Sequence, residues 1–209
     1  MALPVSSLRT GVVAALATLV MLDPALAHHA TGGATPSTFV EGLLSGLGHP
    51  VIGLDHLAFV IAVGIASAFV PRSLFMPLVF VMATAAGVVI HLGAVDLPLV
   101  EPVIALSVVL AGVLIALRLD VPAAAWAALF AFAGVFHGYA YGAAIIGAET
   151  TPLGAYVLGF SAIQYAVAAG ACLLTQSAVA ASRLDRPQIA GGAVAGVGLV
   201  FAAEALMPF

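Results

Sequence analysis

Long apolar segments with almost no charge follow one another through this chain, and this pattern limits its fold most strongly. Apolar residues make up 64% of the 209 residues and charged residues only 7%, whereas soluble domains carry about 25% charged residues. A soluble domain of this length buries only about 70% of the surface that its unfolded chain exposes. Lipid must therefore surround most of the chain, which excludes a cytosolic enzyme and a disordered regulator.

The charge balance excludes a further class of protein. The chain has no lysine, and its five basic residues face nine acidic ones, which gives a net charge of -4. A nucleic-acid binder needs clustered basic side chains that neutralise phosphates. We therefore expect the lipid bilayer as a partner and no nucleic acid.

The N-terminus has the pattern of a cleavable secretory signal peptide over residues 1–27. Arg9 supplies the positive charge, Gly11–Leu22 is a short apolar run, and Ala25-Leu26-Ala27 supplies small residues around a cleavage site. An uncleaved first helix is the alternative. The sequence then predicts a periplasmic segment over residues 28–47 and a transmembrane domain over residues 48–209.

The transmembrane domain is predicted to be all-α, with six spanning helices. Lipid offers no partner to an open strand edge, and no segment alternates as the strands of a barrel do. Proline or glycine marks each connection. The expected spans lie near residues 48–70, 74–92, 99–118, 122–147, 153–178 and 188–207.

The arginines predict the orientation of these spans. Arg72, Arg118, Arg183 and Arg186 fall in loops that lie on one side of the membrane, and the opposite loops contain acids but no arginine. The positive-inside rule makes the arginine side cytoplasmic, which agrees with an exported N-terminus. We expect a multi-pass protein of the bacterial inner membrane with both termini outside the cytoplasm.

Three packing features can also be predicted. Apolar residues at Phe39, Leu43, Leu44 and Leu47 favour a short amphipathic helix over Thr38–Leu47 that lies in the membrane interface. Glycines recur every fourth residue in the fourth span, at Gly134, Gly138 and Gly142, and predict close helix packing. Gln164, in the fifth span, is expected to form a hydrogen bond between helices.

Ionisable residues within spans are expensive and indicate function, and the first span has three of them. His49, Asp55 and His56 stand in the string HPVIGLDH. Imidazoles with a carboxylate suit nickel, cobalt, copper or zinc. In a regular helix the two histidines lie about 10 Å apart and cannot share one ion. Either they form two stations on a path, or Pro50 and Gly53 break the helix.

The remaining candidates come from three other spans. His137 lies in the fourth span, in the string FHGYAYG, with Tyr141 four residues later on the same face. His91 and Glu101 flank a short outer loop, where they either gather cations or face water. The deduced topology puts nearly all of these residues in the outer half of the membrane. The candidate metal ligands are His49, Asp55, His56, His137, His91 and Glu101.

These segments resemble the HupE/UreJ family of hydrogenase and urease accessory membrane proteins. The signal peptide, HPVIGLDH, LPLVEPVIALSVVLAG and FHGYAYG occur in the expected order. The resemblance implies a nickel permease, a function that some members link to cobalt. Its motif residues correspond to His49, Asp55 and His56 in the first span and to Phe136, His137 and Gly138 in the fourth.

The fourth span departs from the family pattern F-H-G-x-A-H-G-x-E. Tyr141 stands where the pattern has its second histidine, and Ala144 stands where it has glutamate. Two histidines at positions i and i+4 can chelate one ion, and this span has only one. Either the metal differs from nickel, the affinity is lower, or His91 and Glu101 complete the site.

The expected function is uptake of a divalent transition metal, nickel or cobalt, from periplasm to cytoplasm. No cofactor is expected to stay bound, because the ion is cargo, and no ATP-binding motif is present. An intramembrane metal-dependent hydrolase is the main alternative, with Asp55 or Glu101 as its base, and a bis-histidine haem protein is a weaker one. The sequence leaves open whether copies of the chain form a homo-oligomer.

Overall fold

The computed structural model describes residues 35–181 and 185–207, and their secondary structure is entirely helical. The signal peptide expected over residues 1–27 lies outside the described residues, as do Arg183 and the start of the segment expected over residues 28–47. The helices are α3 (Phe39–Ile52), α4 (Leu54–Ser67), α5 (Met76–Leu92), α6 (Val100–Ala116), α7 (Ala123–Ala143), α8 (Thr150–Ala180) and α9 (Asp185–Leu206).

Helix α3 begins at Phe39 because the residues before it satisfy its first backbone amides. The Thr38 hydroxyl accepts a hydrogen bond from Glu41 N, and the Glu41 carboxylate accepts one from Ser37 N. The helix expected over Thr38–Leu47 therefore exists, but it extends to Ile52. Its buried face is Gly42, Ser45, Gly46, His49 and Pro50 rather than the leucines.

The first expected span, near 48–70, is not one straight helix. The chain bends by 80° between α3 and α4, at Gly53, whose backbone is extended. Pro50 lies in the last turn of α3 and has no N–H to donate to the preceding turn. Of the two alternatives for this segment, the broken helix is the one observed.

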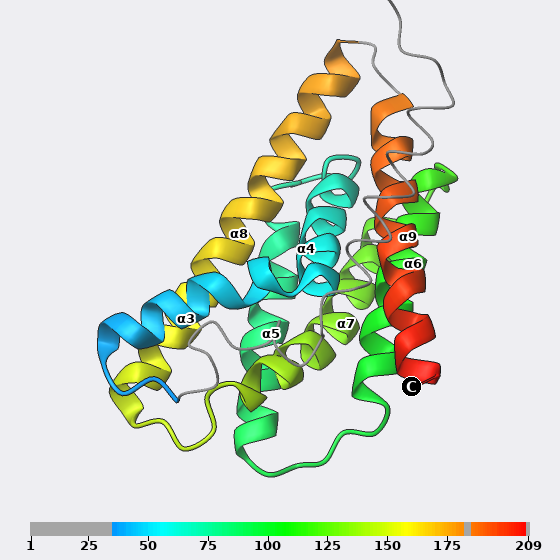
Figure 1. Cartoon of the computed structure of the whole chain (residues 1–209). Helices are drawn as coiled ribbons and strands as arrows, with labels where there is room; N and C mark the ends of the chain where they lie inside the picture. Colours follow the sequence, from blue (N-terminus) through cyan, green and yellow to red (C-terminus); the bar gives the residue numbers. More distant parts are fainter. Residues whose placement is uncertain (1–34, 182–184, 208–209) are drawn as a thin grey trace, which may run out of the picture.

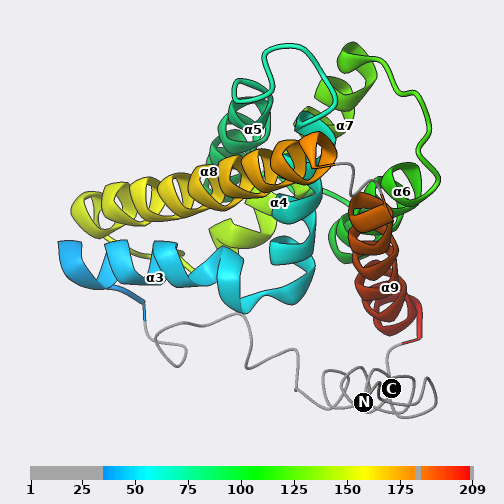
Figure 2. The same ribbon diagram turned by 90° about the horizontal axis from the view of Figure 1, so that it is seen from above.

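Three pairs of helices pack with their backbones almost in contact. They are α5 with α7, α6 with α9, and α3 with α8 (Figure 2). A side chain at Gly138 would collide with the backbone of Thr84 on α5, and one at Gly46 would collide with Tyr156 on α8. The predicted close packing of the α7 glycines is thus confirmed, and the neighbour of this seam is α5.

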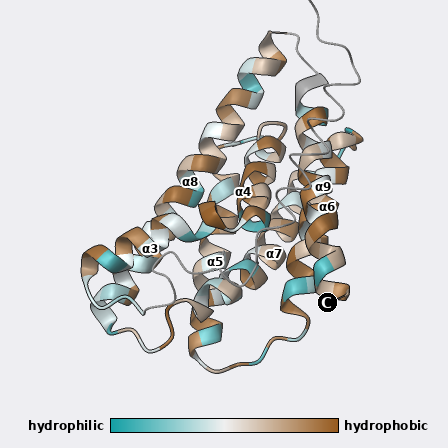
Figure 3. Ribbon diagram, in the orientation of Figure 1, coloured by the Kyte–Doolittle hydropathy of each residue, from teal (hydrophilic) through white to brown (hydrophobic). Residues whose placement is uncertain are grey.

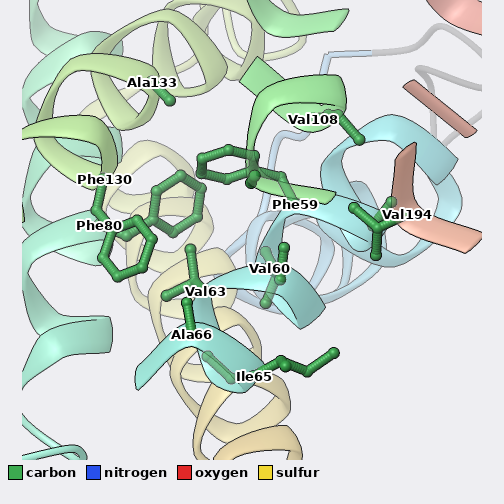
Figure 4. Packing of buried hydrophobic residues seen from close by; sticks show 14 of the residues in the cluster. Phe59, Val60, Val63, Ile65, Ala66, Phe80, Val108, Phe130, Ala133 and Val194 are labelled. Atoms are coloured by element: carbon green, nitrogen blue, oxygen red, sulfur yellow. The ribbon is translucent and has the colours of Figure 1, made fainter. Parts of the chain in front are cut away.

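Helix α4 lies among these pairs (Figure 1). It is the most buried of the helices that the structure describes. Its contacts extend to α3, α5, α6, α7, α8 and α9. Figure 4 shows the apolar packing around it, where the rings of Phe59, Phe80 and Phe130 gather together. The N-terminal turn of this central helix carries Asp55 and His56, so the candidate site is in the interior.

Hydrophobic residues occur along all of the helices (Figure 3), and many large apolar side chains are exposed on the outside. Leu174, Val89 and Met82 are among the most exposed of them, as expected where lipid is the solvent. Among the described residues, α7, α8 and Pro187–Leu206 are long and apolar enough to cross a membrane, and α3 with α4 would add a fourth span. Helices α5 and α6 are apolar but have 17 residues each.

Each segment expected as a span is thus helical near its predicted position, and the first one is broken. The expected number of six membrane spans stays a prediction, because three of the described helices, or four spans with the bent pair, are long and apolar enough to cross. The loops after α4 and α6, which carry Arg72 and Arg118, lie at one end of the molecule (Figure 1). The loops after α5 and α7 lie at the other end. We call these the arginine end and the opposite end below.

Candidate metal centre

Three histidines meet where α3, α4 and α7 converge. His49 is in the last turn of α3, His56 in the first turn of α4, and His137 in α7. The ring centres of His49 and His56 are 5.8 Å apart, and those of His56 and His137 are 5.0 Å apart. The bend at Gly53 makes this possible, because it folds His49 back over His56.

The hydrogen bonds of this cluster indicate which nitrogen of each imidazole carries the proton. The Ser107 hydroxyl on α6 donates to the Ile104 carbonyl, so its oxygen accepts from His137 Nε2 at 3.2 Å. Neutral His137 then has its lone pair on Nδ1, which accepts a hydrogen bond from His56 Nδ1 at 2.8 Å. The lone pair of neutral His56 is therefore on Nε2, the atom suited to bind a metal.

Asp55 is buried beside the histidines but is engaged by the backbone. Its Oδ1 accepts a hydrogen bond from His56 N at 2.8 Å and lies 4.0 Å from His56 Nδ1. The carboxylate thus satisfies an amide in the first turn of α4, where a negative charge also complements the helix dipole. In this arrangement Asp55 places a carboxylate beside the His56 ring.

The Tyr141 ring contacts two of the histidines. Its centre is 4.8 Å from that of His49 and 4.7 Å from that of His56. The Tyr141 hydroxyl accepts a hydrogen bond from Gln164 Nε2 at 2.9 Å. The single proton of the Thr84 hydroxyl is shared between Val81 O at 2.8 Å and Gln164 Oε1 at 3.0 Å. The interhelical hydrogen bond expected for Gln164 is thereby confirmed, and it ties α5, α7 and α8 together.

A pocket of about 310 Å³ connects the cluster to the opposite end of the molecule. It is lined by His49, His91, Glu101 and Tyr139, together with Val100, two alanines of α7 and the alanine that follows this helix. The His91 ring lies against Tyr139, with 4.4 Å between ring centres. The six residues predicted as ligands thus form two connected groups that share His49: the buried cluster and this pocket.

The residues fit successive binding of an ion better than one closed site. Two imidazoles that bind one ion through bonds of about 2.1 Å have ring centres about 5 to 6 Å apart, and His49 and His56 have this separation. Among the described residues, however, no three His, Cys, Asp or Glu side chains surround a common point. A cage of three or more such ligands is not formed in this arrangement.

Two contributors to the cluster did not emerge from the sequence. Ser107 orients His137, and Thr84 completes the network around Tyr141. Both are single hydroxyls in apolar spans, and such residues usually bond to their own helix, as these two also do. Only the packing of α5 and α6 against α7 and α8 brings them to the cluster.

Comparison with known proteins bears directly on this arrangement. The family model described as HupE / UreJ protein matches residues 16–201. The chain belongs to the HupE/UreJ family. The family comprises hydrogenase and urease accessory membrane proteins, and both motif segments of the cluster lie within the matched region. A membrane location follows from this membership and from the apolar helices.

One curated relative illustrates how far the similarity extends. Protein HupE of Rhizobium leguminosarum bv. viciae is 35% identical over 121 residues, which are 57% of this chain and 61% of that relative. The chain thus matches about three fifths of the length of this HupE protein. No solved structure matches the chain.

Proposed function

We propose that this HupE/UreJ protein is a permease of the bacterial inner membrane that carries a divalent transition metal, nickel or cobalt, from the periplasm to the cytoplasm. The observation that carries this proposal is the continuous row of imidazoles. It begins at His49 in the wall of the pocket and continues through His56 to His137 in the core.

The chemistry of this row favours such a cargo. Neutral imidazole binds nickel, cobalt, copper and zinc, whereas magnesium and calcium prefer sites made of oxygen atoms. The chain has a single cysteine, Cys172, which lies buried in α8, so the row offers the ion no pair of thiolates. Nickel and cobalt fit this donor set. Uptake of nickel would also supply the enzymes that hydrogenase and urease accessory proteins serve.

Weak successive sites suit transport better than a cage does. A conducted ion must bind well enough to enter and loosely enough to leave. Glu101 and His91 would attract the hydrated ion into the pocket, and His49 and His56 Nε2 would then replace part of its water shell. The Ser107–His137–His56 hydrogen bonds support this step because they keep the lone pair of His56 on Nε2.

The distribution of arginines supports inward movement. Arg72 and Arg118 lie at the end of the molecule away from the pocket, and the positive-inside rule assigns that end to the cytoplasm. The pocket would then open to the periplasm. A membrane potential, negative inside, favours entry of a 2+ ion by about 4.6 kcal/mol per 100 mV, so no nucleotide is required.

The hydrolase alternative has less support. A hydrolytic zinc site holds its metal with three protein ligands and keeps a fourth position for water. Among the described residues no such group of three converges, and Asp55 already accepts a backbone hydrogen bond. The family is also one of accessory and transport proteins.

Metal accumulation by cells tests the proposal. Cells expressing the wild type, His56→Ala, Ser67→Ala or an empty vector at equal membrane levels are exposed to nickel, cobalt, zinc and manganese, and each metal is measured by elemental mass spectrometry. Ser67 is the matched control because it is a buried polar residue of the same helix whose hydroxyl donates to Val63 O in its own helix.

We expect nickel or cobalt to accumulate with the wild type and with Ser67→Ala, and to fall to the vector level with His56→Ala. Equal accumulation in all four strains would contradict the permease. Equal accumulation in the wild type and both variants, above the vector level, would leave a permease whose route does not involve His56.

A further inference from the structure

A row of aromatic rings continues from His137 toward the arginine end of the molecule. The Phe59 ring centre is 4.7 Å from that of His137 and 5.2 Å from that of Phe80. Phe59 also faces Phe130 at 6.5 Å, and Phe130 faces Trp126 at 5.6 Å. The imidazoles are thus followed directly by a second row, made of rings that cannot coordinate a cation through a lone pair.

The same order occurs on both helices that line this axis. From the opposite end to the arginine end, α4 presents His56, then Phe59, then Ala66. Helix α7 runs the other way and presents His137, then Phe130, then Trp126 along the same direction. At a rise of about 1.5 Å per residue, Ala66 lies about 15 Å from His56 along α4, and Phe59 lies about 4.5 Å from His56. On α7, Phe130 lies about 10.5 Å from His137.

A second pocket lies beyond the aromatic row. It has a volume of about 380 Å³ and lies between the ends of α4, α6, α7 and α9. Trp126 and Ala66 form part of its wall, and it also contains the charged residues Arg118 and Asp120. The two pockets therefore face opposite ends of the molecule, and the histidines and then the aromatic rings lie between them.

We infer that Phe59, Phe80 and Phe130 form the constriction that the cargo ion crosses between His137 and the pocket of Asp120. This inference rests on the proposed permease function and extends it by naming the barrier and the release site. Phe59 and Phe130 are 0% exposed and Phe80 is 1% exposed. In this conformation the three rings therefore close the route. We call these three rings the aromatic constriction.

The physical basis of the constriction is the cost of dehydrating an ion. Apolar constrictions block ions because water leaves them, and an ion without water or ligands is very unstable there. The faces of aromatic rings attract cations. When the rings rotate aside and the ion passes along their faces, this attraction lowers the barrier. Asp120 then supplies an oxygen atom at the far side. The constriction thus holds the ion at the imidazoles, where it is selected. Release into the pocket of Asp120 follows.

Flux through reconstituted protein tests the inference. Purified wild type, Phe130→Ala, Phe130→Leu, Phe160→Ala and His56→Ala are placed in liposomes with an entrapped fluorescent metal indicator. The initial rates of entry of Ni²⁺ and Ca²⁺ are measured, and Ni²⁺ binding is measured on the same proteins in detergent. Phe160 is the matched control, because it is 0% exposed but packs with Tyr141 and Tyr156 away from the constriction.

We expect Phe130→Ala to admit Ni²⁺ several-fold faster than the wild type and to admit Ca²⁺, which the wild type excludes. Phe130→Leu, which still fills most of the space, should lie between the two, and Ni²⁺ binding should change less than twofold in both. Phe160→Ala leaves the three rings in place, so it should still exclude Ca²⁺ and should not admit Ni²⁺ faster than the wild type.

Two results would overturn the constriction. In the first, both Phe130 variants keep the flux and the selectivity of the wild type, while His56→Ala abolishes flux. This result would leave the permease function intact. The second is an equal increase in Phe130→Ala and Phe160→Ala, which would indicate general loosening. Absence of metal flux in the wild type would instead overturn the proposed function and the constriction with it.

Discussion

At the scale of single residues, the hydrogen bonds of Ser107 on α6 indicate the tautomers of two histidines in other helices, His137 and His56. The Ser107 hydroxyl donates a hydrogen bond to Ile104 O with its only proton, and it accepts a hydrogen bond from His137 Nε2. His137 Nδ1 must then accept from His56 Nδ1. Partners of this kind hold metal-binding imidazoles in one tautomer and one orientation.

Ser107→Ala is therefore expected to weaken metal binding without removing any ligand. The substitution leaves His137 Nε2 without its acceptor and allows the other tautomer, which places the lone pair of His56 on the wrong nitrogen. We expect Ni²⁺ affinity to fall by about 10-fold to 100-fold, measured by calorimetric titration of the purified protein. Ser67→Ala, a buried serine of α4, should bind as the wild type does, and equal binding by both variants would contradict this role.

At the scale of elements, glycine and proline decide how the helices approach one another. The bend at Gly53 turns one apolar segment into two helices at 80°, and a side chain at Gly53 would come within 2.7 Å of His56 Cδ2. On α7, Gly138 allows the backbone of α5 to lie against it. Broken helices whose ends face a binding site occur in transporters, where they are stable only inside the protein.

Gly138→Ala is expected to destabilise the protein. The new methyl group would meet the backbone of Thr84, which cannot rotate aside, so α5 and α7 must separate. Overpacking of this kind costs about 1 to 3 kcal/mol. Thermal unfolding in detergent measures the effect. Gly170→Ala on α8 is the control, since nothing lies within 4 Å of its new methyl group, and it should stabilise the helix by about 0.5 to 1 kcal/mol.

At the scale of the whole molecule, the two pockets give the chain two distinct ends. The pocket of His91 and Glu101 faces the end with the loops after α5 and α7, and the pocket of Asp120 faces the end with Arg72 and Arg118. Their opposite placement is what a path through a membrane requires. The arginines predict how the proposed path is oriented in the cell, and this prediction can be tested directly.

Cysteine labelling tests this orientation. Cys172 is the only cysteine and is buried, so Cys172→Ala provides a clean background for single cysteines at two exposed positions. Val95→Cys, in the loop after α5, should react with a membrane-impermeant thiol reagent added to intact cells. Leu119→Cys, in the loop after α6, should react only after the inner membrane is opened. The reverse pattern would mean that the pocket of His91 faces the cytoplasm.

The sequence by itself determined the fold class and the chemistry of the candidate site. Hydropathy and turn residues located the helices, because lipid leaves each segment only its own backbone as a hydrogen-bond partner. The scarcity of ionisable residues made His49, His56 and His137 stand out, and the glycine spacing of α7 predicted its close packing. These properties depend on composition and local spacing, which a sequence displays directly.

Only the tertiary structure decided how these residues meet. In a straight helix His49 and His56 are about 10 Å apart, and the bend at Gly53 brings their ring centres to 5.8 Å. The roles of Ser107 and the aromatic constriction also depend on contacts between residues far apart in the chain, which no local pattern encodes. The physical reason is that an apolar helix in lipid is stable in many packings, and side-chain shape and buried hydrogen bonds select among them.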